Sequence, residues 1–197
     1  MRTAVVIDTH GGPEVLRWRA LPDLEPPPGH VRVRVTHVAL NHLDLWVRRG
    51  VPGHDFHLPR IPGSDVAGVL LDATDTLPAG TRVALHPSWG CGGCARCLDG
   101  QQDRCRQFRI RGETADGGCV TELALPPAQL LPIPDVLSSA EAAALPLTLL
   151  TAWHMLVGRA RLARGEKVLV QAGASGVGVM AIQIARLFDC EIGRAHV

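Results

Sequence analysis

Four of the six cysteines lie close together, in the spacing C-x2-C-x2-C-x7-C, at Cys91, Cys94, Cys97 and Cys105. Four thiolates at such a spacing can surround a zinc ion tetrahedrally, which leaves no coordination position open for a substrate. The glycines at positions 90, 92 and 93 allow the backbone to fold tightly around the ion. The pattern therefore predicts one zinc ion with a structural role.

Other uses of these cysteines stay open at this stage. Unligated or disulfide-linked cysteines and an iron–sulfur cluster are alternatives, although disulfides are uncommon in a chain without an export signal. Nearby arginines also suggest a zinc ribbon that binds nucleic acid, but acidic residues dilute their charge and no aromatic platform accompanies them. We expect Cys119 and Cys190 to be isolated buried thiols.

A second chemical signal is a glycine-rich turn after an apolar segment. The segment Val168–Ala172 leads into Gly173, Ala174, Ser175, Gly176, Val177 and Gly178, and a helical pattern follows. A strand, a tight turn and a helix N-terminus together form the dinucleotide-binding fingerprint, in which backbone N–H groups contact a pyrophosphate. Ser175 replaces the central glycine of that motif. The turn predicts NAD or NADP binding, with an ordinary strand–helix turn as the alternative.

The elements that must position these residues change in kind along the chain. Short β-branched segments predict strands over Thr3–Ile7, Val31–Val35, Val66–Leu71 and Thr81–His86, with one helix that Asn41 caps and Gly50 ends. The capping box from Ser138 to Glu141 opens a helical region, and further helices are predicted over 148–159 and 177–187, with an intervening strand over 167–171. The order is a β-rich module followed by the beginning of a βαβ unit.

Composition excludes several classes of protein. The 197 residues are 46% hydrophobic and 20% charged with a formal net charge of +1, which is typical of globular proteins and predicts no nucleic-acid partner. Without a long apolar run or a signal peptide, we expect a cytoplasmic protein with no membrane partner.

Several motifs together resemble the medium-chain dehydrogenase/reductase superfamily. Besides the cysteines and the glycine-rich turn, the resemblance rests on four stretches: 11–16 (GGPEVL), 39–44 (ALNHLD), 61–68 (IPGSDVAG) and 145–152 (LPLTLLTA). The resemblance implies an α/β protein with an N-terminal chaperonin-10-like β-barrel domain over 1–133. This domain carries a zinc lobe over 88–112, and the first part of a Rossmann doubly wound parallel sheet follows over 134–190.

The last residues are expected to be a non-native tail over 191–197. The segment 192–197 resembles the translation of a sequencing adapter, and we leave it out of the predicted fold. Without it, only one strand and one helix of the parallel sheet are present. The chain is therefore expected to be a C-terminally truncated fragment that is inactive alone.

The departures from the superfamily concern its catalytic metal. Zinc alcohol dehydrogenases bind a catalytic zinc through two cysteines and a histidine, at positions that fall on Asn41, Ser64 and Leu147 here. A carboxamide, a hydroxyl and an alkyl group cannot supply thiolate and imidazole ligands. The resemblance thus favours the quinone-reductase-like branch. A metal site rebuilt from His54 and His57 is a further alternative.

The predicted function is hydride transfer between NAD(P) and a quinone, an enone or another small carbonyl compound, without catalytic zinc. By resemblance, Asn41 and Thr151 are candidate catalytic residues that contact the nicotinamide or the substrate, and His42 approaches the pyrophosphate. Asn41 as a helix cap, His42 as an exposed helix residue and Thr151 as a core hydroxyl are the structural alternatives. The resemblance also implies a homodimer or homotetramer. A zinc-dependent alcohol dehydrogenase and a non-enzymatic zinc-binding interaction domain remain alternatives.

Overall fold

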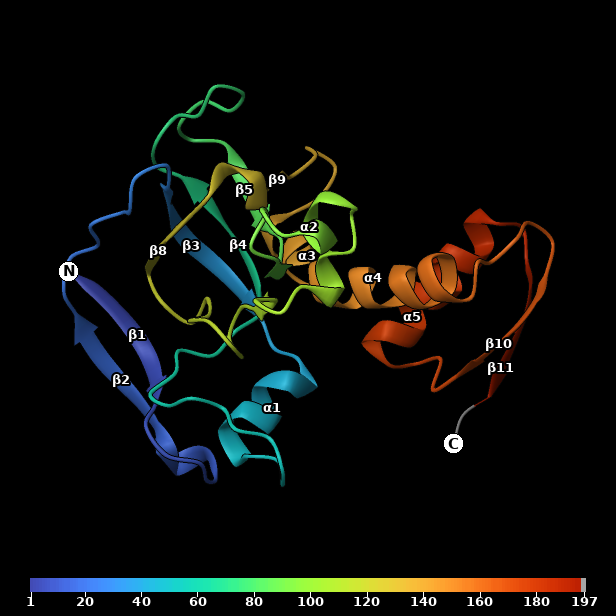
Figure 1. Ribbon diagram of the computed structural model, residues 1–197, viewed down its shortest axis with the longest axis horizontal. Helices are drawn as coiled ribbons and strands as arrows, with labels where there is room; N and C mark the ends of the chain where they lie inside the picture. The colour runs from blue at the N-terminus through green and yellow to red at the C-terminus, as the bar shows by residue number, and fades with distance from the viewer. Residues whose placement is uncertain (196–197) are drawn as a thin grey trace. The chain divides into compact units, whose positions relative to one another are not determined.

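The computed structural model describes the backbone of residues 1–195 and the side chains of residues 1–193. The chain divides into two compact units, Met1–Ala144 and Leu145–Val197, and each is described by itself (Figure 1). Sequence analysis instead placed the boundary between residues 133 and 134.

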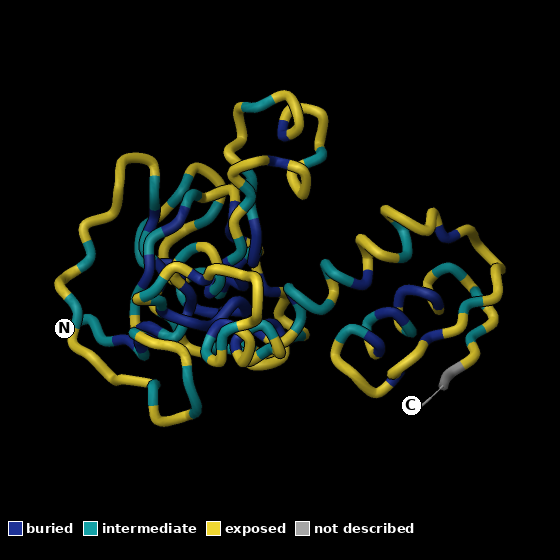
Figure 2. Tube along the Cα trace, turned by 60° about the horizontal axis from the view of Figure 1, so that its bottom comes forward, coloured by how far each residue is buried: buried dark blue, intermediate teal, exposed yellow. Residues whose placement is uncertain are grey.

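The first unit is built on a five-stranded antiparallel sheet in the order β8-β3-β4-β5-β9. Its strands are β3 (Val31–Ala39), β4 (Asp65–Leu70), β5 (Arg82–Leu85), β8 (Glu122–Leu125) and β9 (Leu130–Pro132). In β3 the buried Val31 and Val33 alternate with arginines, as the sequence predicted for a half-buried strand. The interior of this unit contains most of the buried trace in Figure 2.

A hairpin of β1 (Arg2–Ile7) and β2 (Leu16–Leu21) lies beside this sheet (Figure 1). Bridges from Ala4 to Val120 and from Ile7 to Arg60 attach β1 to the rest of the unit. Sequence analysis predicted β1 but not β2. Almost every residue of β2 is exposed, so this strand lacks the buried apolar pattern by which strands are found.

The segment with the four cysteines forms a small lobe with little regular structure. It contains the short pair β6 (Ser88–Trp89) and β7 (Arg109–Ile110), the helix α2 (Ala95–Leu98) and a 3-10 turn over Gln102–Arg104. Further 3-10 turns lie at Pro13–Val15 and Pro127–Gln129.

Two helices complete the first unit. Helix α1 (His42–Arg49) begins after its N-cap residue Asn41 and ends at Gly50, as predicted. Helix α3 (Ser139–Ala143) begins at the predicted capping box. Its Ala142 and Ala143 are buried with Ile133 and alanines of β4 and β5. The first unit therefore extends to Ala144 because α3 completes its core.

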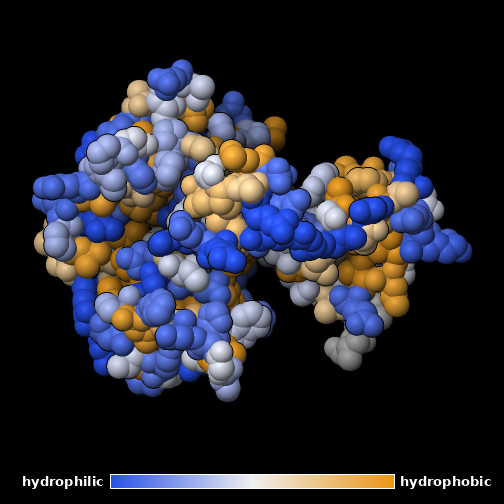
Figure 3. All heavy atoms as spheres, viewed as in Figure 1, coloured by the Kyte–Doolittle hydropathy of each residue, from blue (hydrophilic) through white to orange (hydrophobic). Residues whose placement is uncertain are grey.

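The second unit contains α4 (Pro146–Trp153), β10 (Lys167–Gln171), α5 (Gly176–Leu187) and β11 (Glu191–Ala195). Wider π-helical turns over His154–Arg159 follow α4, where the sequence predicted a continuous helix to residue 159. The core of this unit gathers Ala152, Val170, Ala181 and Ile184. Leu169 and Leu187 stay exposed, and Figure 3 shows hydrophobic atoms on the surface of this unit around β10 and β11.

The prediction that only one strand of the parallel sheet is present was wrong. Strand β11 pairs in parallel with β10, with Val168 opposite Ile192. Ile192 also packs against the core of the second unit. Sequence analysis missed this strand because it excluded the predicted non-native tail over 191–197, whose last two residues lie outside the described residues.

Candidate functional site

The four clustered cysteines come together as the spacing predicted. The sulfur atoms of Cys91, Cys94, Cys97 and Cys105 all lie within 4.8 Å of one another. Two of the Sγ···Sγ distances are 4.0 Å (Cys91 to Cys97) and 3.8 Å (Cys94 to Cys105). A zinc ion with Zn–S bonds of about 2.3 Å in a tetrahedron separates its sulfurs by about 3.8 Å. The cluster therefore fits a tetrahedral zinc ion.

The backbone around the cluster leaves room for the sulfur atoms and donates hydrogen bonds to them. A side-chain Cβ at Gly90 would lie 2.5 Å from Sγ of Cys97, so only glycine fits there. The backbone N–H groups of Cys91 and Gln107 donate to Sγ of Cys105, at 3.4 and 3.3 Å. Such N–H···S contacts stabilise thiolates. All four positions of the tetrahedron are filled by protein, which is typical of a structural metal site.

The thiols differ in how readily they lose their protons. Hydrogen bonds from the backbone N–H groups of Gly93 and Cys94 lower the pKa of Cys91 to about 6, whereas burial raises the pKa of Cys97 to about 11. Because zinc binds thiolates, binding must release the proton of Cys97.

A second polar group lies where α1 begins, and it centres on Asn41. The side-chain Nδ2 of Asn41 donates to Oδ2 of Asp65 at 3.0 Å, and the backbone N–H of Asn41 donates to Oδ2 of Asp44 at 2.8 Å. Both carboxylates are buried, with Asp65 only 1% exposed. Asn41 and Asp44 together form a capping box, so Asn41 is the N-cap residue of α1.

Asp44 joins the start of α1 to the loop before β4. Its second oxygen, Oδ1, accepts from the backbone N–H of Gly63 at 2.8 Å. Burial, the largest influence, raises the pKa of this carboxyl, while the N–H groups of Asn41 and Gly63 act in the opposite direction. Burial, followed by the nearby Asp44 charge, raises the pKa of the Cys119 thiol to about 11. Cys119 is thus a partly buried thiol apart from the cluster.

Ser64 stands between Gly63 and Asp65 and is fully buried. Its Oγ has no hydrogen-bond partner among the described residues. Within the described part of the chain, the four cysteines form the one group of three or more metal-ligating side chains that lie together. Asn41 and Ser64, at two of the three positions that correspond to catalytic zinc ligands, carry an amide and a hydroxyl instead of a thiolate or an imidazole.

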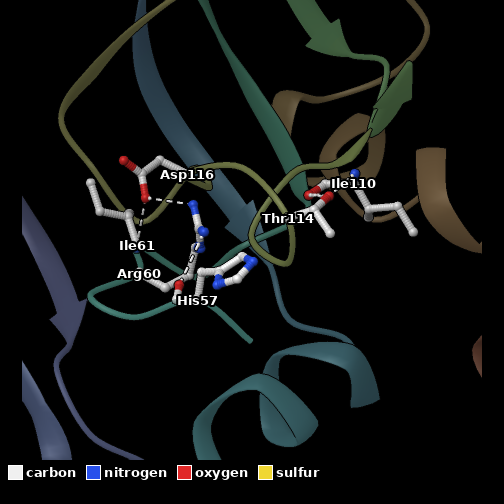
Figure 4. Close-up of polar contacts among 6 residues, drawn as sticks. All are labelled: His57, Arg60, Ile61, Ile110, Thr114 and Asp116. Carbon is white, nitrogen blue, oxygen red and sulfur yellow. Dashed lines mark hydrogen bonds and ion pairs between the residues drawn. The ribbon is translucent and has the colours of Figure 1, made fainter. Parts of the chain in front are cut away.

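The loop over residues 111–118 packs closely against the segment that carries Ser64 and Asp65. Figure 4 shows Arg60 between the backbone oxygen of His57, at 3.0 Å, and Oδ1 of Asp116, at 3.3 Å. Asp116 also accepts from the backbone N–H of Ile61. A Cβ at Gly117 would lie 2.3 Å from the carbonyl oxygen of Pro62, so glycine permits this close approach.

The histidines of the proposed rebuilt site have carboxylate partners. Nε2 of His54 lies 3.6 Å from Glu113, and Nδ1 of His57 lies 3.6 Å from Asp55. Neither belongs to a metal-ligating group among the described residues.

The glycine-rich turn forms the predicted strand–turn–helix. Ser175 is the N-cap of α5, and its Oγ accepts from the backbone N–H of Gly178 at 3.1 Å. A Cβ at Gly178 would lie 2.3 Å from the carbonyl oxygen of Ala172, so this glycine lets helix and strand approach closely. The left-handed residue of the turn is Ala172, with φ of +50°.

The remaining candidates, His42 and Thr151, lie on helices of different units. His42 is exposed on α1, with its ring 6.4 Å from that of Trp46. Thr151 belongs to α4, and its hydroxyl donates to the carbonyl oxygen of Leu147 at 2.7 Å. That bond is the structural alternative considered for Thr151, and the oxygen keeps lone pairs for another donor.

Asp65 is the site residue that sequence analysis missed. It was quoted only as part of the stretch 61–68, although a carboxylate in an otherwise apolar strand pattern was a usable signal. Charged side chains are seldom fully buried without a partner.

Comparison with known proteins gives these contacts a context. The model of the alcohol dehydrogenase GroES-like domain matches residues 27–135. This chain belongs to that family. The match, together with the relatives below, confirms the resemblance to the medium-chain dehydrogenase/reductase superfamily and the predicted chaperonin-10-like domain.

Solved structures and curated proteins agree with this assignment. An NAD-dependent alcohol dehydrogenase is 45% identical, with a TM-score of 0.91 over 98% of this chain and 57% of that one. The quinone oxidoreductase of Thermus thermophilus is 34% identical, with a TM-score of 0.74 over 98% of this chain and 53% of that one. The quinone oxidoreductase of Mus musculus is 29% identical over 96% of this chain.

The chain spans about half the length of such relatives, for example 50% of the mouse protein. No described helix has the length and apolar character needed to cross a bilayer.

Proposed function

We propose that this protein is an NAD(P)-dependent oxidoreductase that transfers hydride between nicotinamide and a quinone, an enone or another small carbonyl compound, without a catalytic zinc. One observation carries the proposal. At the positions of two catalytic zinc ligands the chain has Asn41, whose amide is bonded to Asp65, and the buried hydroxyl of Ser64. Leu147 takes the third position. Zinc strongly prefers thiolate and imidazole ligands, which none of these residues provides.

The reaction direction follows from the same donor set. Oxidation of an alcohol benefits from a metal that lowers the pKa of the hydroxyl group. Reduction of a quinone or an enone needs only a carbonyl held by hydrogen bonds beside the hydride donor. The relatives include both alcohol dehydrogenases and quinone oxidoreductases, and the chemistry of Asn41 and Ser64 favours the second group.

Each unit has a separate task in this mechanism. The nicotinamide coenzyme, when bound, supplies or accepts the hydride. The turn from Ser175 to Gly178 at the start of α5 binds the pyrophosphate, because the positive end of a helix attracts anions. The N–H groups of Ser175 and Gly178 already donate to Ala172 and to the Ser175 hydroxyl, so those of Gly176 and Val177 point to the ligand. Gly173 and Ala174 let the turn approach it. Thr151 and Asn41 offer hydrogen bonds to the nicotinamide or substrate, and His42 contacts the pyrophosphate.

The zinc ion has no part in the chemistry of this proposal. Cys91, Cys94, Cys97 and Cys105 would hold it with four thiolates, and it would fix a lobe that has few regular elements of its own. The proposal has further parts. It divides the chain into domains over 1–133 and 134–190 and a non-native tail over 191–197. It also places the protein in the cytoplasm, as a homodimer or homotetramer.

The test is a measurement on the complete gene product. We expect one zinc ion per chain by atomic emission, and NADPH or NADH oxidation with a panel of quinones and enones that EDTA does not abolish. Activity toward alcohols alone, lost when a labile second zinc is removed, would replace this proposal with a zinc-dependent alcohol dehydrogenase. The 45% identity to an NAD-dependent alcohol dehydrogenase is the observation that favours this second candidate.

A non-enzymatic zinc-binding interaction domain is the competing class of function. Titration of the complete gene product with NADH and NADPH separates the two, since an interaction domain would bind neither nucleotide.

A further inference from the structure

Asp65 is a buried carboxylate to which none of the functions above gives a task. It is the first residue of β4, and the β3–β4 register places it opposite Ala39, the last residue of β3. Asn41 follows two residues after Ala39. The strand pairing therefore brings a 1% exposed carboxylate beside the side chain of Asn41, and Oδ2 of Asp65 accepts from Nδ2 at 3.0 Å.

A carboxylate resolves an ambiguity that every asparagine side chain has. The two ends of a carboxamide have nearly the same shape, and rotation by 180° exchanges a donor for an acceptor. Oδ2 of Asp65 accepts from Nδ2, so the NH2 end of Asn41 faces Asp65. The acceptor belongs to a carboxyl group that is 1% exposed, which makes the bond stronger than an exposed amide contact.

The backbone and the side chain of Asn41 are held by different acids. Asp44 accepts from the backbone N–H of Asn41 and ties it to Gly63, whereas Asp65 contacts only the side-chain amide among the bonds described for Asn41. In the capping box the side chain of Asn41 faces the backbone of Asp44, and Asp65 is not a member of that box. The bond to Asp65 instead holds the opposite, NH2 end of the amide and so sets the direction of the side chain.

We propose that Asp65 is a positioning residue, which fixes the carboxamide of Asn41 so that one N–H and the oxygen Oδ1 are presented in a defined orientation to a carboxamide or carbonyl group of the bound nicotinamide or substrate. The inference rests on the proposed role of Asn41 in hydride transfer. A group with both a donor and an acceptor, such as a primary carboxamide, is the class of partner that this orientation suits.

The first test needs no activity and uses the 197-residue chain. In a proton–nitrogen correlation NMR spectrum the side-chain NH2 signal of Asn41, assigned by its loss in Asn41→Asp, is expected to have one strongly downfield proton. Asp65→Ala should abolish this displacement, and Asp65→Asn should retain part of it, since an amide oxygen can still accept. Ser64→Ala is the matched control, because Ser64 is the adjacent buried residue and its hydroxyl has no partner among the described residues.

The second test uses the complete gene product and asks whether Asp65 acts through Asn41. Loss of orientation of a reacting group costs on the order of 10- to 100-fold in rate. We expect Asp65→Ala to lower kcat by about tenfold, Asp65→Asn to recover much of it, and the double variant with Asn41→Ala to be no slower than Asn41→Ala alone.

The outcomes separate this inference from the proposed function. An unchanged Asn41 amide signal in Asp65→Ala, or independent effects of the two substitutions in an active enzyme, would overturn the positioning role and leave the proposed reaction intact. A wild-type protein with no affinity for NADH or NADPH would remove both.

Discussion

The cysteine lobe and the group around Asn41 contrast within one unit of the same chain. In the lobe, four sulfurs lie within 4.8 Å of one another and fit zinc. In the group around Asn41, the amide of Asn41 is bonded to the carboxylate of Asp65. The hydroxyl of Ser64 has no hydrogen-bond partner among the described residues. One family fold thus carries a site shaped for a metal and a site shaped for hydrogen bonds. The side chains present, and not the fold, decide which groups bind.

The largest effect is expected when the metal site is broken. Cys97→Ser removes a buried thiolate, and we expect bound zinc to fall from one ion per chain to nearly none, with loss of the lobe's structure. Structural zinc sites in small domains are worth roughly 10–16 kcal/mol of apparent binding free energy. Atomic emission of the purified chain measures this, with Cys190→Ser, outside the cluster, as the control. Full zinc content in Cys97→Ser would show that the cluster does not hold the ion.

A large effect is also expected at the start of α5. In Gly178→Val a Cβ would meet backbone atoms of Ala172 and Gly173, which cannot move aside as side chains do. We expect a loss of about 3 kcal/mol in the free energy of unfolding of the second unit, and loss of nucleotide binding by the complete gene product. Ser175→Ala, which removes only the cap bond, should cost about 1 kcal/mol. Chemical denaturation measures both, and equal costs would contradict the close helix–strand approach.

The carboxylate of Asp44 gives a smaller, pH-dependent effect. In Asp44→Asn the new amide can accept from only one of the N–H groups of Asn41 and Gly63, so we expect a cost of about 2 kcal/mol. Because burial raises the pKa of Asp44, the folded state holds its proton more tightly than the unfolded state does.

The sign of the pH dependence follows from this difference. Between the unfolded pKa of about 3.9 and the higher folded value, wild-type stability due to Asp44 falls as pH rises. The stability difference between wild type and Asp44→Asn should therefore be greatest below this window and smaller above it. Urea unfolding across the acidic range up to neutral pH measures it, and a difference that grows with pH would mean that ionised Asp44 stabilises the fold.

The smallest effect is expected at Ser64. Its buried Oγ has no partner among the described residues, so Ser64→Ala removes an unsatisfied hydroxyl and should raise the free energy of unfolding by about 1 kcal/mol. Thermal unfolding measures the change. A clear loss of stability would indicate that Ser64 has a bound water or ligand and would weaken the contrast with the cysteine lobe.

Sequence reasoning succeeded where the signal was a pattern of near neighbours. The caps Asn41 and Ser138 and the strand–turn–helix around Ser175 are confirmed, because each depends on residues within a few positions of one another. It failed for β2, which is exposed, and for β11, which was excluded as a tail. The packing of α3 on β4 and β5, which joins residues up to Ala144 to the first compact unit, is not visible in a local pattern either.

By itself, the sequence determined the metal cluster and the glycine-rich turn, because their ligands and N–H groups lie on short continuous segments. Only the tertiary structure decided the surroundings of Asn41. Its partner Asp65 is 24 residues away, and the link from Asp44 to Gly63 spans 19 residues. These contacts depend on how β3 pairs with β4 and on which polar groups are buried together. Neither can be predicted from the conformational preferences of neighbouring residues.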